Sequence, residues 1–259
     1  MRPFTVALLA VSLAAALAST TATPRTTAPT VAAPAAPAAI SRINGGIEIE
    51  DEQHAGSLST VNGRIRVGAK ARTGDIEAVN GGIYIGDGAR VGAVETVNGR
   101  VRMGKAVRAG AIEVVNGGIR LGRNCRVRRI GTVSGQVFVD HDGHVAGDIK
   151  TVNGSIGIVA SRVDGDVDTV AGDITIGIGS HVQGGLRVRP PGHHGLLGRL
   201  MPVSTKPPTP RIIIGPDAVV EGPLLFEREV RLFVHASART GPITGATAVP
   251  FDGPRPPQD

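Results

Sequence analysis

The fold is decided by the stretch Val79-Asn80-Gly81-Gly82-Ile83-Tyr84-Ile85-Gly86, whose wording returns every 18 residues. The recurring tripeptide ends in glycine and begins, with one interval of 19 residues, at Ile43, Val61, Val79, Val97, Val115, Val133, Val152 and Val170. A short fixed period is typical of a solenoid, in which each coil packs only on its neighbours. Residues 40–188 are therefore expected to form stacked coils.

Glycine and asparagine columns mark one corner of each coil. The glycines are Gly45, Gly63, Gly81, Gly99, Gly117, Gly135, Gly154 and Gly172. The asparagines that precede them are Asn44, Asn62, Asn80, Asn98, Asn116 and Asn153. Asn-Gly is typical of turns, so we expect the glycines to adopt positive φ and the stacked amides to form a structural ladder along the axis.

Apolar residues alternate with other residues after this corner, as in Ile83-Tyr84-Ile85 and Val101-Arg102-Met103. A period of two with one apolar face predicts strands. Two further glycine columns, which include Gly86 and Gly92, mark two more corners. The expected fold class is therefore all-β: a single-stranded, three-sided parallel β-helix with 18-residue coils.

The composition fits a narrow interior. The chain has 259 residues, no Trp, one Tyr and 2% aromatic residues, so Val, Ile, Leu and Ala must fill the core. Cys125 falls in the same inward column as Ala71 and Ala89, which predicts a buried structural thiol. A single cysteine cannot form an intramolecular disulfide.

Charged residues form two rows on the outside of the expected coils. Glu77, Glu95 and Glu113 stack before the Asn-Gly corner. The arginine stripe after the corner is made of Arg64, Arg66, Arg100, Arg102 and Arg120. The formal net charge is +6 at pH 7, which favours anionic partners. Two interpretations stay open: the stripe binds an anionic glycan or lipid headgroup, or it is a solvated face that serves solubility.

The N-terminal segment differs in composition from the coils. Residues 1–18 combine Arg2, an apolar run and a small-residue exit at Ala16-Leu17-Ala18, which is the pattern of a secretory signal peptide. The run is shorter than the roughly 20 residues of a membrane-spanning helix. We expect the mature protein to be exported, to the periplasm, the cell envelope or the medium, with no transmembrane segment after cleavage. Residues 19–39, rich in Thr, Ala and Pro, predict a disordered linker.

The period breaks after Val188. Residues 189–210 are rich in proline and glycine and predict an insert loop, because proline cannot donate to a strand ladder. Residues 211–248 predict terminal β-helix coils and a cap, with Phe226 and Phe233 closing the open end. Residues 249–259 predict a disordered tail.

Few residue clusters carry chemistry. Asp140-His141-Asp142-Gly143-His144 is the densest set of metal-type ligands, but no further cluster with ligand spacing supports it, so a polar corner is favoured. His193-His194 is a weaker candidate, and the acidic residues from Asp164 to Asp173 lack a calcium-loop pattern. The sequence contains no phosphate loop and no nucleophile elbow. We therefore expect no cofactor, no metal and no catalytic residue, and one tyrosine is too few for stacking nucleic-acid bases.

The repeated wording Thr-Val-Asn-Gly-x-Ile-x-Ile-Gly over residues 43–188 resembles two groups of bacterial β-solenoids. One is the bactofilins, which form polymers, and the other is an adhesin-like family with the same Val-Asn-Gly-x-Ile repeat. The resemblance implies a right-handed helix without enzymatic activity that associates end to end. The signal peptide and the proline-rich insert depart from the bactofilin pattern and favour the cell envelope over a cytoskeletal role.

Three functions stay open. The favoured one is an exported envelope protein with a structural, adhesin-like or self-assembling role. The second is a module that binds anionic envelope polysaccharide or lipopolysaccharide through the arginine stripe. The third is a β-helix enzyme, either an acyltransferase or a polysaccharide lyase. Apolar-glycine pairs such as Ile85-Gly86 are typical of the acyltransferase helix, but the export signal argues against that enzyme. A lyase would need acidic calcium ligands, which are missing.

Overall fold

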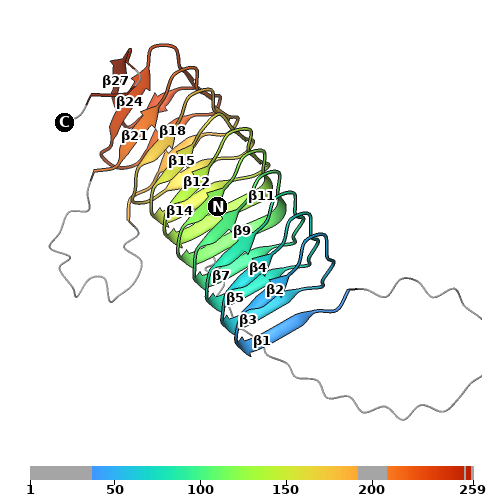
Figure 1. The fold of residues 1–259 in the computed structure, drawn as a ribbon. Coiled ribbons are helices and arrows are strands. Elements are labelled where there is room, and N and C mark those ends of the chain that lie inside the picture. Colours follow the sequence, from blue (N-terminus) through green and yellow to red (C-terminus); the bar gives the residue numbers. More distant parts are fainter. Residues whose placement is uncertain (1–36, 192–208, 254, 258–259) are drawn as a thin grey trace, which may run out of the picture. The chain divides into compact units, whose positions relative to one another are not determined.

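The computed structural model describes residues 37–191, 209–253 and 255–257, which form a parallel β-solenoid (Figure 1). These residues contain strands and turns but no helix, and their strands pair in parallel. One sheet holds 11 strands, one from each coil, so the stack has about 11 coils and a length of roughly 50 Å at the usual strand spacing. The predicted all-β parallel solenoid with coils of about 18 residues is confirmed.

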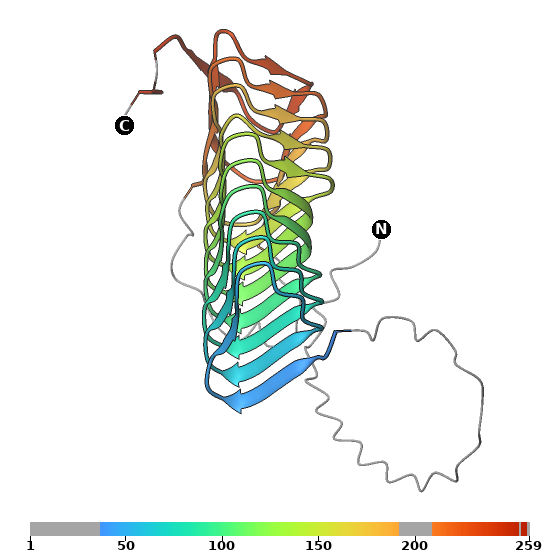
Figure 2. The same ribbon diagram turned by 45° about the vertical axis from the view of Figure 1, so that its right-hand side comes forward.

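Strands in equivalent positions of successive coils lie side by side (Figure 2) and pair in three ladders. The first ladder precedes the Asn-Gly corner and contains β1 (Ile40–Asn44), β3 (Leu58–Asn62), β5 (Ile76–Asn80), β7 (Val94–Asn98), β9 (Arg108–Asn116), β11 (Arg126–Ser134), β14 (Ile149–Asn153), β17 (Val167–Thr169), β20 (Leu186–Val188), β23 (Leu224–Phe226) and β26 (Ile243–Thr244).

The second ladder follows the Asn-Gly corner. It contains β2 (Ile47–Ile49), β4 (Ile65–Val67), β6 (Ile83–Ile85), β8 (Val101–Met103), β10 (Ile119–Leu121), β12 (Val137–Val139), β15 (Ile156–Ile158), β18 (Ile174–Ile176), β21 (Arg211–Ile214), β24 (Arg231–His235) and β27 (Ala248–Phe251).

The third ladder completes each coil. It begins as single bridges from His54 to Arg72 and from Arg72 to Arg90, and it runs through the first residues of the long strands β9 and β11. Its later members are β13 (His144–Val145), β16 (Arg162–Val163), β19 (His181–Val182), β22 (Val219–Val220) and β25 (Arg239–Thr240). The triangular cross-section and the right-handed turn stay predictions.

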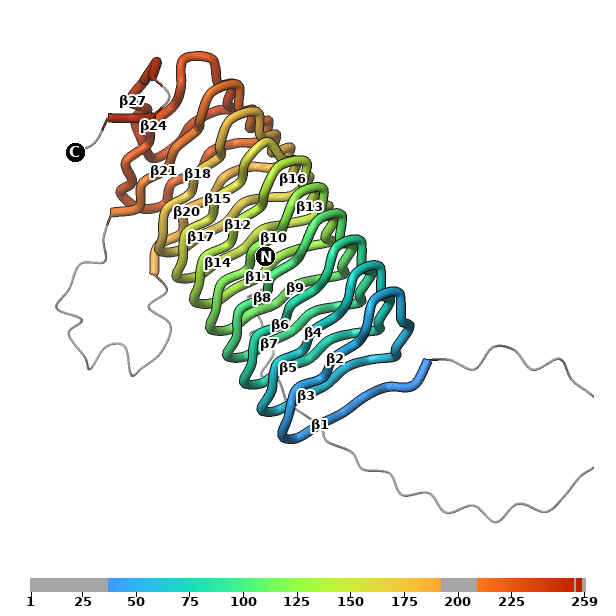
Figure 3. Tube along the Cα trace, viewed as in Figure 1, coloured from blue at the N-terminus to red at the C-terminus, as the bar shows by residue number. Residues whose placement is uncertain are grey.

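The strand register survives every irregularity in the repeat, and the trace runs coil against coil from β1 to β24 (Figure 3). Val139 pairs with Ile158 across the 19-residue interval. Ile174 pairs with Ile212, so β18 and β21 are neighbours although the proline-rich segment separates them in sequence. Inward apolar positions, rather than coil length, therefore determine which strands pair.

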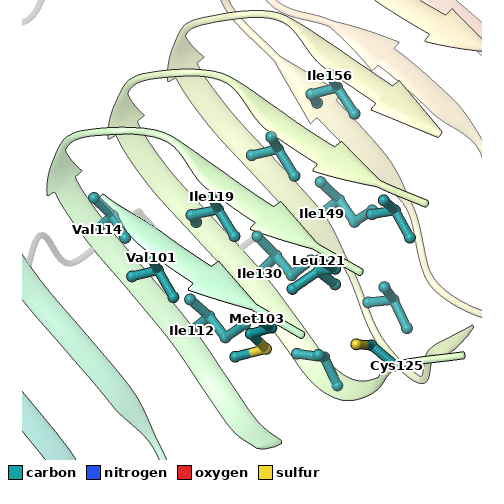
Figure 4. Packing of buried hydrophobic residues seen from close by; sticks show 14 of the residues in the cluster. Val101, Met103, Ile112, Val114, Ile119, Leu121, Cys125, Ile130, Ile149 and Ile156 are labelled. Carbon is teal, nitrogen blue, oxygen red and sulfur yellow. The ribbon is translucent and has the colours of Figure 1, made fainter. Parts of the chain in front are cut away.

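Alternation buries one face of the strands from β2 to β21 in the second ladder. The side chains on the inward face fill a continuous core, in which Val101, Met103, Ile119 and Leu121 stack from coil to coil (Figure 4). Cys125 is fully buried in this core, as predicted, and its Sγ lies 3.1 Å from the carbonyl oxygen of Gly104. Burial raises the pKa of the Cys125 thiol, so the thiol is a packing element.

The tripeptide glycines are required mainly by close stacking and less by positive φ. Gly81 and Gly117 have positive φ, but Gly63, Gly99 and Gly154 do not. A Cβ built on Gly99 would overlap the carbonyl oxygen of Gly81 in the preceding coil, and the other stacked glycines of the column meet the same obstacle. The expectation of positive φ was therefore wrong at these three positions, where the backbone approach is what excludes a side chain, and it was confirmed at the other five: Gly45, Gly81, Gly117, Gly135 and Gly172.

A different column supplies a left-handed turn in the coils from β2 to β21. It lies between the second and third ladders and contains Glu52, Lys70, Gly88, Ala106, Asn124, Asp142, Ala160, Gly179 and Asp217. Most of these residues are not glycine, so no glycine pattern revealed this corner. Their left-handed conformations cost free energy, which the paired coils on both sides offset.

The C-terminal boundary differs from the one expected. β27 extends through Phe251, so Val249, Pro250 and Phe251 belong to the last strand and not to a tail. The expectation that Phe226 and Phe233 close the open end was wrong, because β23 and β24 each pair with a strand on both sides. Phe226 joins the core, whereas Phe233 lies outside the core cluster, with the guanidinium of Arg211 4.9 Å from its ring centroid. The signal peptide (1–18), most of the linker (19–39), His193-His194 and most of the insert (189–210) lie outside the described residues.

Candidate functional site

The asparagine column forms a hydrogen-bonded ladder along one corner. The Nδ2 of Asn80 donates to the Oδ1 of Asn62 at 3.0 Å, and the Nδ2 of Asn98 donates to Asn80 at 3.0 Å. The same bond joins Asn62 to Asn44 and Asn116 to Asn98. The ladder stops at Ser134, which stands in register between Asn116 and Asn153. These amides satisfy one another, so they act as a structural ladder.

Aspartates cap backbone amides of the next coil. The Oδ1 of Asp148 accepts from the Asp166 N–H, and the Oδ1 of Asp166 accepts from the Gly185 N–H. Asp173 accepts in the same way from the Arg211 N–H at 2.8 Å. The acidic residues from Asp164 to Asp173 therefore serve corners or ion pairs. Within the described residues, no group of three or more His, Cys, Asp or Glu side chains is placed to hold a metal ion.

The loop Asp140–His144 divides into two separate pairs. His141 Nδ1 lies 2.6 Å from Asp140 Oδ1, and this bond lowers the pKa of the Asp140 carboxyl. His144 Nε2 lies 2.7 Å from Asp164 Oδ2, one coil further along. Arg162 and then His144 lower the pKa of Asp164. The two histidines thus have different partners, as in a polar corner.

The arginine stripe is interrupted and partly neutralised. Its register runs from Arg66 through Tyr84 to Arg102 and Arg120, so an aromatic ring separates the first arginine from the next. Arg66 forms an ion pair with Glu48 at 3.4 Å. The guanidinium of Arg64 lies 5.5 Å from the centroid of the Tyr84 ring.

Two arginines at the ends of the stripe therefore cover aromatic rings. Besides Arg64, Arg120 lies 4.8 Å from the centroid of the Phe138 ring, and both contacts suit a cation–π interaction. Arg100 and Arg102 are exposed and take part in no ion pair within the described coils. Within the described coils, two arginines of the stripe are thus unpaired, and the other three have intramolecular partners.

A longer row of basic residues lies in the third ladder. One side chain per coil projects from the same register position, and we call these residues the basic row: His54, Arg72, Arg90, Arg108, Arg126, His144, Arg162, His181 and Arg239. Val219 is the one interruption, between His181 and Arg239. At about 4.8 Å per coil, the row is a straight line of cationic groups parallel to the axis.

The two parts of the basic row differ in their partners. Arg72, Arg90, Arg108 and Arg126 are exposed and form no ion pair within the coils that the structure describes. Further along, Arg162 lies 2.7 Å from Asp164 and His181 lies 2.7 Å from Glu221. Within the described coils, the row is therefore open from Arg72 to Arg126 and paired from His144 to His181.

Sequence reasoning missed the basic row, although its signal was present. The arginines recur at the same 18-residue interval as the Asn-Gly tripeptide. They follow the inward column of Ala71, Ala89 and Cys125 by one residue, and alternation places them outward. The arginines of the basic row are therefore visible in the sequence when the third side of each coil is aligned by the 18-residue period.

The glutamate row lies in register in the first ladder, from Glu77 through Glu95 to Glu113. Burial raises the pKa of the Glu95 carboxyl, and the neighbouring Glu113 and Glu77 raise it further. Arg129 offsets part of this repulsion through an ion pair with Glu113 at 2.8 Å.

Two shallow open depressions in the described part of the stack each adjoin one set of basic residues. One, of about 500 Å³, is lined by residues that include His54 and Arg72 at the start of the basic row. The other, of about 450 Å³, is lined by residues that include Arg66, Tyr84 and Arg102 of the second ladder.

The first coil presents an open strand edge. Within the described residues, β1 and β2 pair on one side only. The Ile47 N–H donates to the Arg64 carbonyl, and the Ile49 carbonyl accepts from the Gly68 N–H. Because alternate residues of a strand direct their backbone groups to opposite sides, the N–H and C=O of Glu48 face the open edge.

The last coil presents a blunted edge. Within the described residues, β27 pairs only with β24. The Phe251 carbonyl accepts from the Ala236 N–H of the preceding coil, so Pro250 directs its backbone toward the open side. Proline has no N–H, and this edge therefore lacks a donor where the first coil has one.

Comparisons with protein-family models, with curated proteins and with solved structures find no match to this chain. The fold and its surface rows define a parallel β-solenoid repeat protein. The described residues include no helix with the length and hydropathy needed to cross a membrane.

Proposed function

We propose that the chain is an exported, non-enzymatic structural protein of the cell envelope, which self-associates through the strand edge of its first coil. The edge of β1 and β2 carries this proposal, because unpaired parallel strands are a template for pairing with a second chain. The resemblance to bactofilins and to the adhesin-like family supports a structural role. The use of histidines and aspartates as corner caps and ion pairs supports a role without catalysis.

The difference between the two ends favours a pair of copies over a long filament. An open filament needs both ends of each copy, joined head to tail. Pro250 removes a hydrogen-bond donor from the last coil, whereas the Glu48 N–H of the first coil has no backbone partner among the described residues. Two first coils related by a twofold axis can instead continue their sheets in antiparallel fashion.

The test is the assembly state of residues 19–259, measured by light scattering and negative-stain electron microscopy over a range of concentrations. We expect dimers with the length of two stacks joined end to end. Glu48→Pro removes the free donor, and the residue before it, Ile47, is already extended, so this variant should be monomeric. Glu48→Ala is the matched control, because it loses the same ion pair with Arg66 but keeps the N–H, and it should still form dimers.

Two results would contradict this proposal. A wild-type monomer at every concentration would remove the self-association. Unchanged dimers in Glu48→Pro would place the contact elsewhere, for example on the partly exposed apolar residues Ile43, Val115 and Val133 beside the Asn-Gly corner. The variant Pro250→Val restores a donor to the last coil and should convert dimers into longer assemblies.

A further inference from the structure

The open part of the basic row has the geometry of a binding site for a linear polyanion. Arg72, Arg90, Arg108 and Arg126 occupy four consecutive coils in one register. Their spacing is that of the strands, about 4.8 Å, and the line is one residue wide. Like charges at this spacing repel one another, and an anionic chain along the row would remove that repulsion.

The surface beside the row is low enough for a polymer to approach. Residues two positions apart in a strand share a face. Gly74, Gly92 and Gly110 lie two positions after Arg72, Arg90 and Arg108, whereas Arg128 lies two positions after Arg126. Small residues therefore follow three of the four arginines, and exposed Arg128 adds a further cation beside Arg126. At the first coil the row reaches the depression lined by His54 and Arg72.

The chemistry of the row favours carboxylates on an extended chain. Guanidinium groups bind carboxylates through two parallel hydrogen bonds, a match that an ammonium group does not provide. A row one residue wide is complementary to a thread and not to a flat membrane surface. Nucleic acid is disfavoured because the row contains no Phe, Tyr or Trp side chain to stack on bases. An extended sugar chain with one carboxylate per residue has a charge spacing similar to that of the coils.

We propose that Arg72, Arg90, Arg108 and Arg126 bind a linear polysaccharide that carries carboxylate groups, with the polymer parallel to the solenoid axis. The site is distinct from the arginine stripe, which follows the Asn-Gly corner and in which Arg64, Arg66 and Arg120 have intramolecular partners. The proposal does not depend on pairing through the first coil, because the row lies on the side of the stack and not on its open edge.

The test measures the binding of polygalacturonate to residues 19–259 by titration calorimetry at several salt concentrations. The row variant combines Arg72→Gln, Arg90→Gln, Arg108→Gln and Arg126→Gln. The stripe variant, which removes the same number of charges from the other ladder, combines Arg64→Gln, Arg100→Gln, Arg102→Gln and Arg120→Gln. We expect the row variant to lose roughly tenfold or more in affinity, because each exposed charge pair contributes a modest binding free energy and the four contributions add up. The stripe variant should stay close to wild type.

Oligomer length gives a second readout. Affinity for galacturonate oligomers should rise with length until the oligomer spans the four arginines and then level off, because successive contacts are tethered to one another. The salt dependence of binding should become weaker in the row variant, since fewer charges are neutralised there.

Several results would overturn the proposal. These are equal loss of affinity in the two variants, binding of neutral dextran as tight as that of polygalacturonate, or binding of anionic lipid vesicles without binding of polygalacturonate. If the row variant does not fold, the four Arg→Lys substitutions serve instead, because they keep the charge but lose the forked hydrogen bonds. Reduced polygalacturonate affinity in the lysine variant supports the proposal, and unchanged affinity overturns it.

Discussion

The coils before Ile130 and the coils from Ile130 onward share one interior but differ on the outside. The first set is strictly periodic, with an asparagine ladder, an open basic row and an open strand edge. The second set contains a 19-residue interval, the proline-rich segment, histidines and arginines paired with acids, and a proline in its edge strand. Yet Ile83 and Ile174 are equally buried and pair in the same ladder.

This difference teaches that the inward register carries the fold, while the outer rows are free to vary. A coil tolerates an insertion or a lost corner amide as long as its inward residues meet those of the neighbouring coil. A row that stays unbroken on the outside therefore calls for a reason other than folding. The open arginines of the first set are such a row, because their mutual repulsion opposes stacking.

The largest expected effect tests the shared interior. Ile83→Ala in the first set and Ile174→Ala in the second should each destabilise the fold by about 2–5 kcal/mol, through lost burial and the cavity left behind. The two losses should be similar, measured by denaturant unfolding. A much smaller loss for Ile174→Ala would show that the less regular coils are also less well packed.

The next effect tests the stacking of glycines. Gly99→Ala places a Cβ against the Gly81 carbonyl and should cost about 1–3 kcal/mol. Gly131→Ala is the matched control, because the nearest atom to its added Cβ is Glu113 Cγ at 3.8 Å. This control should unfold at the same denaturant concentration as wild type or slightly higher. Equal destabilisation by both would contradict the stacking explanation.

A smaller effect separates the two sets at the Asn-Gly corner. Asn80→Ala removes two amide bonds, one to Asn62 and one from Asn98, and should lower stability by about 1 kcal/mol. Asn153 makes no side-chain hydrogen bond within the described residues, so Asn153→Ala should cost clearly less. Thermal unfolding measures the difference, and Asn80→Ala should melt at the lower temperature. Identical melting temperatures for the two variants would count against a structural role for the ladder.

The smallest effect concerns the glutamate row, which exists only in the first set. Folding raises the pKa of Glu95, so the folded state favours its protonated form, and its contribution to stability falls as pH rises above the ordinary value of 4.5. Glu95→Gln should therefore stabilise the fold at neutral pH by about 0.2–1 kcal/mol. The advantage should disappear in acid, as followed by unfolding at a series of pH values.

Glu77→Gln gives the comparison for this prediction. Glu77 has one glutamate neighbour in register where Glu95 has two, so its substitution should gain less. In the second set the same column holds Lys150 and Asp168, whose opposite charges alternate.

The sequence was sufficient for the coils because their information is local and repeated. The 18-residue period and the alternation around Tyr84 predicted parallel strands and an inward Cys125, and the structure has both. The left-handed corner was not predictable, since Lys70 and Ala106 carry no turn signature of their own. Phe233 was misjudged because β24 pairs with β27 as well as β21, which places it away from the open end, and Pro250 was misjudged because its strand is held only by β24.

The candidate site was only partly predictable for a related reason. The arginine stripe was visible from spacing, but its neutralisation depends on Glu48 and on rings one coil away. The 18-residue spacing alone reveals the column of the basic row. The structure is needed to show that Arg90 and Arg108 have no acidic partner in the described coils, whereas Arg162 has one.

The most direct test of the account is arginine footprinting of the full mature chain, with and without polygalacturonate, by arginine-selective labelling and mass spectrometry. One experiment reports on both parts of the basic row and on the stripe. The account predicts that the polymer protects Arg72, Arg90, Arg108 and Arg126, while the labelling of Arg162 and Arg239 stays unchanged. Equal protection along the whole row, or protection of Arg102 and Arg120 instead, would contradict it.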